Sequence, residues 1–290
     1  MRSCLIFNPT ARGEKARAVH AGLQTWIGQC AVLLTTGPGH AQTLAAQAVR
    51  DGFKVIVAAG GDGTINEVVN GIAVAPGGLT GVKLGILPLG TVNVFARELG
   101  LPRGVRAAWG TIGAGRETLV DLGRAEFDSG QVRFFVQLAG AGIDSRAIEL
   151  VNWKLKKKIG PLAYVVAGLQ AWREPQPMIA VENGAAGELV LLGNGRYYGG
   201  SFSFFPKASL RDGLLEVCVF PKVSVPRLAQ AAFGMVTGRL GQMSSAVRSQ
   251  AKSVKLTSAS RVMLQLDGEN VGELPARLSV VPNALRVIVP

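Results

Sequence analysis

Cysteine, histidine and long apolar runs are scarce in this chain of 290 residues. The three cysteines, Cys4, Cys30 and Cys218, are too scattered for a disulfide framework or a metal knuckle, and they fit a reducing cytoplasm. The two histidines lie in no HExxH or catalytic-triad pattern. No apolar run reaches the ~20 residues that span a bilayer, and we expect a first strand rather than a leader within residues 1–9.

Carboxylates are also few, and they are distributed unevenly. Lys and Arg number 31 against 19 Asp and Glu, which gives a net charge of +12. Residues 217–266 contain no acid, and residues 146–173 contain six cations against one acid. Such an excess attracts nucleic acid, acidic substrates or an anionic membrane. Because no RRM, KH or helix-turn-helix pattern accompanies it, we expect no nucleic-acid partner.

Strand-like and helix-like segments alternate over the first 120 residues. This alternation predicts a parallel sheet covered by helices, with ligands at the carboxyl ends of its strands. We expect strands at 4–7, 31–35, 54–58 and 83–87, and helices at 15–27, 41–51, 64–72, 91–99 and 105–112.

Strand-like runs dominate after residue 120, separated by Gly, Pro and Asn turns. They predict a mainly antiparallel β-sandwich, so we divide the chain into an α/β domain, 1–120, and a β-rich domain, 121–282. The expected strands are 132–138, 178–181, 188–192, 214–220, 262–266, 277–280 and 285–289, with helical inserts at 147–172 and 225–237.

The most informative stretch is GGDGTINE, residues 60–67, which follows an apolar run. Three glycines in four residues let the backbone turn sharply and approach a ligand closely. Thr64 and Glu67 have capping-box spacing, which predicts that a helix begins at Thr64. A helix N-terminus offers free N–H groups to an anion. The pattern therefore predicts a phosphate-holding turn; the alternative is an ordinary turn in which Asp62 is solvated.

Further motifs accompany this stretch in a characteristic order. They are NP (8–9), TTGPGHA (35–41), GGDGTINEVVNG (60–71), PLGTVN (88–93), YGG (198–200) with RDGLLE (211–216), and LDGE (266–269). Together they resemble the diacylglycerol kinase catalytic domain family of bacterial lipid kinases, related to sphingosine and ceramide kinases. No P-loop pattern occurs. The resemblance implies an NAD-kinase-like α/β domain, a β-sandwich, a nucleotide site in the cleft between them, and a final strand, 283–290, that returns to the first domain.

The resemblance also implies ATP and Mg²⁺ as cofactors. The nucleotide-binding residues would be Thr35, Gly60, Gly61, Asp62, Gly63, Thr64, Ile65, Asn66 and Thr91. The Asp62 carboxylate suits Mg²⁺ or its water shell, whereas a helix N-cap is the alternative role of Thr91. A second-domain Mg²⁺ would be held by the carbonyls of Ser209 and Leu214 and by the Asp212 carboxylate; the alternative is an Asp-Gly hairpin turn.

Two further acids, Asp267 and Glu269, flank Gly268 at the end of an apolar run. Both side chains would share one face if the strand continued. The resemblance places a catalytic general base here, and Glu269 matches it best, with Asp267 and Asp62 as alternatives. The non-catalytic interpretation of the motif is a polar hairpin turn. One position departs from the family pattern: Val94 stands where many relatives carry Asp, so one carboxylate of the expected Mg²⁺ network is missing.

We therefore expect an ATP-dependent kinase whose acceptor is diacylglycerol or a similar lipid alcohol. The cluster Lys154, Lys156, Lys157 and Lys158 with apolar neighbours predicts a surface that lies on anionic headgroups at the inner membrane face. Two alternatives stay open. One is a kinase for a soluble acceptor, because NAD kinases also carry GGDGT. The other is a catalytically silent basic membrane-binding module, which Val94 alone supports. A homodimer also stays open.

Overall fold

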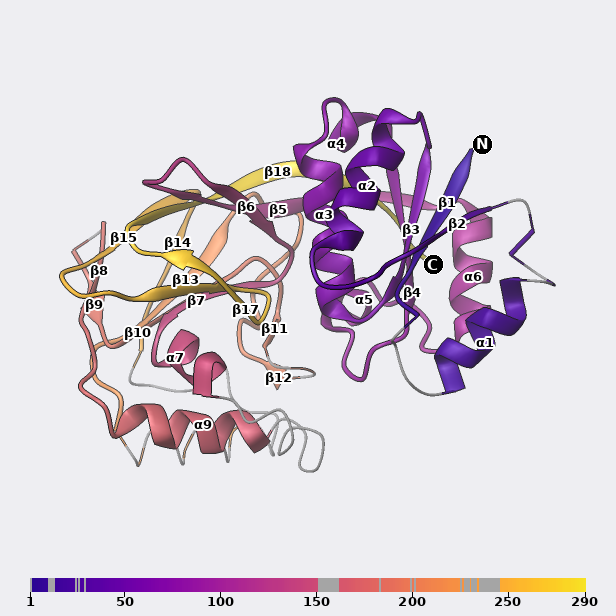
Figure 1. Ribbon diagram of the computed structural model, residues 1–290. Helices are drawn as coiled ribbons and strands as arrows, with labels where there is room; N and C mark the ends of the chain where they lie inside the picture. The colour runs from indigo at the N-terminus through magenta and orange to yellow at the C-terminus, as the bar shows by residue number, and fades with distance from the viewer. Residues whose placement is uncertain are drawn as a thin grey trace. The chain divides into compact units, whose positions relative to one another are not determined.

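The computed structural model divides into two compact units. The first unit is Met1–Leu122 with Pro282–Pro290, and the second unit is Gly123–Val281 (Figure 1). The structure describes residues 2–9, 14–23, 25, 27–28, 30–150, 162–182, 184–198, 200, 202–224, 226, 230, 234 and 246–290. The lysine cluster at 154–158 and most of the predicted helix 225–237 lie outside these residues.

A parallel sheet forms the centre of the first unit. Its strands are β1 (Ser3–Phe7), β2 (Ala31–Leu34), β3 (Val55–Gly60) and β4 (Lys83–Pro88), in the order β2-β1-β3-β4. Except for β2, each strand is almost entirely buried. This is why these segments read as continuous apolar runs rather than as alternating ones.

Helices cover both faces of this sheet (Figure 1). They are α1 (Glu14–Leu23), α2 (His40–Arg50), α3 (Asp62–Val74), α4 (Gly78–Gly81), α5 (Val94–Glu98) and α6 (Val105–Ala114). Leu5, Val57 and Leu87 pack on Val19 of α1 and Ala108 of α6 in one core. The helices α2 and α3 pack closely on each other at Gly71, which has no side chain. A Cβ on Gly71 would lie 2.2 Å from the carbonyl oxygen of Gln42.

The second unit is built on a six-stranded antiparallel sheet. Its order is β14-β13-β10-β7-β16-β17. The strands are β14 (Val247–Ala251), β13 (Leu215–Phe220), β10 (Leu189–Gly193), β7 (Leu138–Gly142), β16 (Met263–Leu266) and β17 (Glu269–Glu273). Against one face pack apolar residues of α7 (Ile143–Leu150) and α9 (Leu162–Trp172), including Ile143 and Ala171.

A second layer of strands packs on the other face of that sheet. It contains β6 (Val132–Phe135), β8 (Ile179–Val181), β9 (Ala186–Gly187), β15 (Ser253–Ser258) and parts of β5 (Glu117–Phe127) and β18 (Ala276–Ile288). One core joins the two layers, with Phe135, Val181 and Leu256 packed against Val190 and Leu264. A small pair, β11 (Tyr197–Tyr198) and β12 (Phe202–Ser203), lies apart from both layers. The predicted fold class, a parallel α/β domain plus an antiparallel β-sandwich, is confirmed.

Several predicted boundaries are wrong, and the long strand β18 shows why. Residues 277–280 and 285–289 were predicted as two strands because Pro282-Asn283 is a turn signal. They form one strand, whose first part pairs with β15 and whose end pairs in parallel with β4. Asn283 takes a positive φ of 50°, and its N–H donates to Asp121 at 2.7 Å, so a local distortion replaces the break.

Other boundaries moved for similar reasons. The run 132–138 is divided between β6 and β7, and the insert 147–172 contains α7 and α9, with residues 151–161 outside the described part. The helix predicted at 91–99 is the shorter α5. The strands β5, β14, β15 and β17 carry too many polar residues to be recognised from apolar runs. Within the described residues, no helix is both long enough and apolar enough to cross a bilayer.

Candidate functional site

Loops that follow the four parallel strands of the first unit meet at one edge of the sheet. Asn8 N–H donates to Ala59 at 3.2 Å, Thr35 N–H donates to Phe7 at 2.9 Å, and Leu89 N–H donates to Gly60 at 2.9 Å. These bonds tie the strand ends to one another. The edge is the carboxyl edge, where open α/β sheets bind their ligands. It holds every residue of the first unit that the sequence predicts to bind nucleotide.

Glycines allow two of these loops to touch backbone to backbone. A Cβ on Gly90 would lie 2.7 Å from the Cα of Gly61 and 2.9 Å from Asn93 Oδ1. A Cβ on Gly60 would lie 2.5 Å from the Thr64 side chain. Any larger residue would push the turns apart, since real Cβ contacts are never so short. The glycines are therefore required by close packing at this edge.

The helix α3 begins at Asp62, with Gly61 as its N-cap. The first main-chain N–H that bonds within the helix is that of Ile65, to Gly61 at 3.1 Å. The N–H groups of Gly63 and Thr64 precede it in the first turn, and the N–H groups of a helix's first turn have no acceptor within the helix. They lie at the positive end of the helix dipole, so the turn can hold an anion.

The predicted capping box is wrong, because Glu67 serves another helix. Its two carboxylate oxygens accept the N–H groups of Gly39, at 2.8 Å, and Ala41, at 3.0 Å. These residues lie at the start of α2, whose N-cap Gly39 has no side chain to contribute. Glu67 thus caps α2 from a distance, and α3 begins two residues before the predicted Thr64.

The Asp62 carboxylate makes a matching contact with the PLGTVN loop. Its Oδ1 accepts the N–H of Val94 at 2.7 Å, at the first residue of α5. Asn93 supports this loop in a left-handed conformation, and its side chain bonds both the N–H and the carbonyl of Gly90. Val94 therefore has no carboxylate to offer at this position, but its backbone N–H holds the carboxylate of Asp62.

The remaining predicted nucleotide residues differ in exposure. Ile65 is fully buried, so only its main chain could meet a ligand. Asn66 is 9% exposed, and its side-chain oxygen accepts a hydrogen bond from Asn70 at 3.0 Å. Thr35 is buried, whereas Thr91 is exposed in its turn. The neighbouring pair Thr36 and His40 was missed: Thr36 N–H donates to His40 Nδ1 at 3.0 Å, which closes the loop before α2.

In the second unit, the loop from Ser209 to Leu214 is a side-chain-supported turn. Asp212 Oδ1 accepts the N–H of Leu214 at 3.0 Å, and Ser209 Oγ accepts the N–H of Arg211 at 3.3 Å. Gly213 takes a positive φ of 68°. Within the described residues, no three His, Cys, Asp or Glu side chains gather to hold a metal. The site predicted here needs only one carboxylate and two main-chain carbonyls, which are the hard oxygen donors that Mg²⁺ takes.

The acids Asp267 and Glu269 do not share a strand face, so that expectation is wrong. The strand β16 ends at Leu266, and Asp267 and Gly268, with φ of 49° and 92°, form a two-residue hairpin turn. Asp267 turns inward and accepts the N–H groups of Val136, Gln137 and Leu138 at 2.8–3.0 Å. Glu269 begins β17 and is exposed. Asp267 is a structural clamp, which leaves Glu269 as the accessible acid of this motif.

Two family models match successive parts of the chain. The diacylglycerol kinase catalytic domain model matches residues 2–125, and the YegS C-terminal NAD kinase beta sandwich-like domain model matches residues 137–289. A diacylglycerol kinase of Staphylococcus epidermidis is 31% identical, and one of Staphylococcus aureus is 30% identical, each over 100% of this chain and 92% of its own length. This chain belongs to the diacylglycerol kinase family.

Solved structures of the family have the same fold. A diacylglycerol kinase structure from Bacillus anthracis str. Sterne is 25% identical with a TM-score of 0.75, covering 100% of this chain and 97% of that one. A second structure from that organism, 23% identical, gives a TM-score of 0.80 with the same coverage. The chain is thus a full-length match to kinases of this family in both sequence and architecture.

One half-buried acid of this kinase-family chain was not found from the sequence. Asp144, in the first turn of α7, accepts hydrogen bonds from Tyr198 Oη and from Gln265 Nε2, the latter at 2.7 Å. Burial raises the pKa of this carboxyl, and the two hydrogen bonds partly oppose the rise. The only sequence signal is an acid that directly follows the small-residue run LAGAGI, 138–143.

Two of the cysteines, Cys4 and Cys218, are buried. Burial raises the pKa of Cys4 to about 12 and that of Cys218 to about 11. Both thiols are therefore neutral at physiological pH, and neutral thiols are poor nucleophiles.

Proposed function

We propose that this protein is an ATP-dependent lipid kinase that transfers the γ-phosphoryl group to the hydroxyl of diacylglycerol or a similar lipid alcohol. The observation that carries the proposal is the carboxyl edge of the first unit, where the start of α3 and the Gly61–Gly90 contact form a turn that can hold an anion. Membership of the diacylglycerol kinase family supports the lipid acceptor.

The first unit would hold the nucleotide phosphates. Phosphoryl transfer depends mainly on positioning and on neutralising charge, so main-chain N–H groups at a helix start are well suited to it. Asp62, fixed by the Val94 N–H, would keep a negative charge beside them. A carboxylate in that place suits Mg²⁺ or the water bound to it, and the bound ion would supply neutralisation of the phosphate charge.

The second unit would contribute the general base, which takes the proton from the hydroxyl of the lipid alcohol. Glu269 is the exposed acid of the LDGE motif, since Asp267 is engaged by three backbone N–H groups. Glu269 would take the proton from the acceptor hydroxyl while the hydroxyl oxygen bonds to the γ-phosphorus and the bond to the β-phosphate oxygen breaks. Asp212 and the carbonyls of Ser209 and Leu214 would hold a second Mg²⁺ that braces their loop.

An anionic membrane would present the lipid. The net charge of +12 and the acid-free segment 217–266 support this partner. Within that segment, the exposed Arg248 on β14 and the Lys252 that follows this strand add to the attraction. Each such cation contributes about 1 kcal/mol near an anionic surface at low salt.

The test is a transfer assay with labelled ATP and a panel of acceptors. Diacylglycerol, a sphingoid base and phosphatidylglycerol are offered in vesicles, and NAD⁺ is offered in solution. We expect label in the product of a lipid alcohol, formed about 10²- to 10³-fold more slowly with Asp62→Asn. Label in NAD⁺ alone would make the protein a soluble-acceptor kinase. ATP binding with no labelled product from the panel would contradict the proposal in favour of a silent membrane-binding module.

A further inference from the structure

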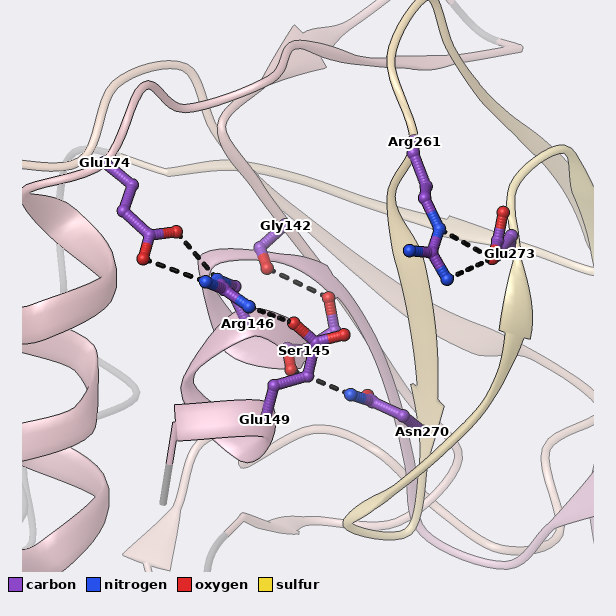
Figure 2. Close-up of polar contacts among 8 residues, drawn as sticks. All are labelled: Gly142, Ser145, Arg146, Glu149, Glu174, Arg261, Asn270 and Glu273. Atoms are coloured by element: carbon purple, nitrogen blue, oxygen red, sulfur yellow. Dashed lines mark hydrogen bonds and ion pairs between the residues drawn. The ribbon is translucent and has the colours of Figure 1, made fainter. Parts of the chain in front are cut away.

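The first turn of α7 is tied to both neighbours of Glu269. Gln265 accepts the N–H of Gly268 through Oε1 at 2.8 Å and donates through Nε2 to Asp144 at 2.7 Å. On the other side, Asn270 Nδ2 donates to the carbonyl of Ser145 at 3.0 Å, as Figure 2 shows. Two consecutive residues of one helical turn therefore hold the residues immediately before and after Glu269.

The anchor at Asp144 is built into the sheet. A Cβ on Gly140 would lie 2.1 Å from Asp144 Oδ2 and 2.7 Å from Gln265 Nε2, so only glycine leaves room for this contact. Tyr198 donates to the other oxygen of the carboxylate. Gln265 is 1% exposed, and Ser145 Oγ donates to the carbonyl of Gly142 at 2.9 Å. A buried and bonded group of this kind holds its geometry rigidly.

Glu269 itself lies on the opposite side of the strand. Side chains alternate along β17, so Glu269 points away from the face that carries Asn270. Its cross-strand partner is Leu266, whose side chain belongs to the core between the two layers, whereas Gln265 pairs with Asn270. The hydrogen bonds described above therefore act on Glu269 through the backbone on each side of it.

We propose that Asp144 and Ser145, acting through Gln265 and Asn270, are positioning residues for the carboxylate of Glu269. The proposal rests on the function proposed above, in which Glu269 accepts the acceptor's proton. A misplacement of about 1 Å at a reacting group can cost about 10²-fold in rate. An exposed acid on an edge strand needs such support to keep its carboxylate in position relative to the substrate.

The direction of the hydrogen bonds gives a sharp test. Gln265 must accept at one end and donate at the other. Asp144→Asn leaves a single side-chain oxygen for the two donors Gln265 Nε2 and Tyr198 Oη, and Gln265→Glu places two carboxylates face to face. In the double variant, the amide introduced at position 144 donates to the carboxylate introduced at position 265. That carboxylate still accepts the Gly268 N–H, and the new amide oxygen still accepts from Tyr198. The double variant therefore rebuilds the chain of bonds with its polarity reversed.

We expect each single variant to lower kcat about 10- to 100-fold, with the KM for ATP within about twofold of wild type. The double variant should recover kcat to within about fivefold of wild type. Asn270→Ala, which removes the second tie, should lower kcat by about tenfold with the same unchanged KM. The control is Arg146→Gln, on the same helical turn, which removes the ion pairs with Glu174 and Glu149 (Figure 2) and should leave kcat unchanged.

Hydrogen exchange at the Gly268 amide gives a readout that does not depend on activity. Its protection should fall in each of Asp144→Asn and Gln265→Glu and return in the double variant. A double variant no better than the singles, or single variants with normal kcat and normal protection, would overturn the proposal. If wild type labels no acceptor, the proposed function fails, and the exchange data still decide whether this chain of bonds holds the turn.

Discussion

The candidate sites of the two units are built by different means. In the first unit, glycines bring main chains into contact, and the carboxylates of Asp62 and Glu67 each bond the start of a helix that lies elsewhere in the sequence. In the second unit, Asp267 accepts three N–H groups, those of the link between β6 and β7 and of the first residue of β7, and Glu269 is exposed at the start of β17. One site presents backbone donors, and the other presents a side chain.

This difference matches the two parts of a transfer reaction. Phosphate is an anion with many oxygens, which convergent N–H groups and helix starts can hold without a flexible side chain. A general base must instead be a titratable side chain that reaches one proton. The predictions below test whether the two units divide the work in this way.

The largest effect is expected for Glu269→Gln. Gln keeps the shape of the side chain and loses the proton acceptor, so kcat should fall about 10²- to 10⁴-fold. ATP binding, measured by calorimetry, should stay near normal because the first unit is unchanged. An equal loss in ATP affinity would show that Glu269 takes part in holding the nucleotide and would remove the contrast between the units.

A loss of about 10²- to 10³-fold in kcat is expected for Asp62→Asn. Asn can still accept the Val94 N–H through its Oδ1, so the loop stays closed and only the charge is lost. The melting temperature should therefore remain near that of wild type. Transfer at the wild-type rate would show that the carboxylate of Asp62 has no role in the reaction.

The glycine contact is tested by Gly90→Ala with Gly110→Ala as its control. The new Cβ at position 90 would lie 2.7 Å from the Cα of Gly61, so we expect about 1–3 kcal/mol of lost stability and weaker ATP binding. Gly110 lies within α6 with nothing within 4 Å of its Cβ position, so the same change should stabilise by about 0.5–1 kcal/mol. Denaturant unfolding measures the change in the free energy of unfolding for both variants. A similar loss of stability in both would contradict the packing argument.

Metal binding in the second unit predicts a smaller effect. Mg²⁺ should raise the melting temperature of wild type more than that of Asp212→Ala, because a ligand of the folded state stabilises it by mass action. Asp128→Ala is the matched control, since Asp128 is also an exposed acid of a turn in this unit, 3.7 Å from Lys255. Equal Mg²⁺ shifts in all three proteins would argue against a metal at Asp212.

The smallest effect is expected at Glu117, in the first unit but outside the loops of its site. Hydrogen bonds from Lys83 and Arg286 lower the pKa of Glu117. A lowered pKa stabilises the fold above the carboxyl's ordinary range, and this contribution is lost as the pH falls through the folded-state pKa. Glu117→Gln should therefore lower the melting temperature slightly at pH 7, and the difference should shrink as the pH falls below the carboxyl's ordinary pKa and vanish below its lowered folded-state pKa. A difference that grew at low pH would reverse this assignment.

Much of the fold could be predicted from local pattern. The buried parallel strands read as apolar runs, and glycine turns follow them directly. The strands β14 and β17 could not be found in this way, because they are edge strands whose side chains are largely exposed. Edge strands are kept polar in soluble sheets, so they carry no apolar signal.

The sequence by itself determined the order of the motifs, the two classes of domain and the identity of the acids that chemistry would need. Tertiary structure decided what each acid does. Glu67 has perfect spacing to cap its own helix, yet it caps α2, because α2 begins with glycine and lies beside it. Asp267 and Glu269 are two residues apart, yet the turn between them points one inward and leaves the other exposed. Local spacing fixes which partners a side chain can reach, and packing of distant segments fixes which unsatisfied N–H groups are there to be bonded.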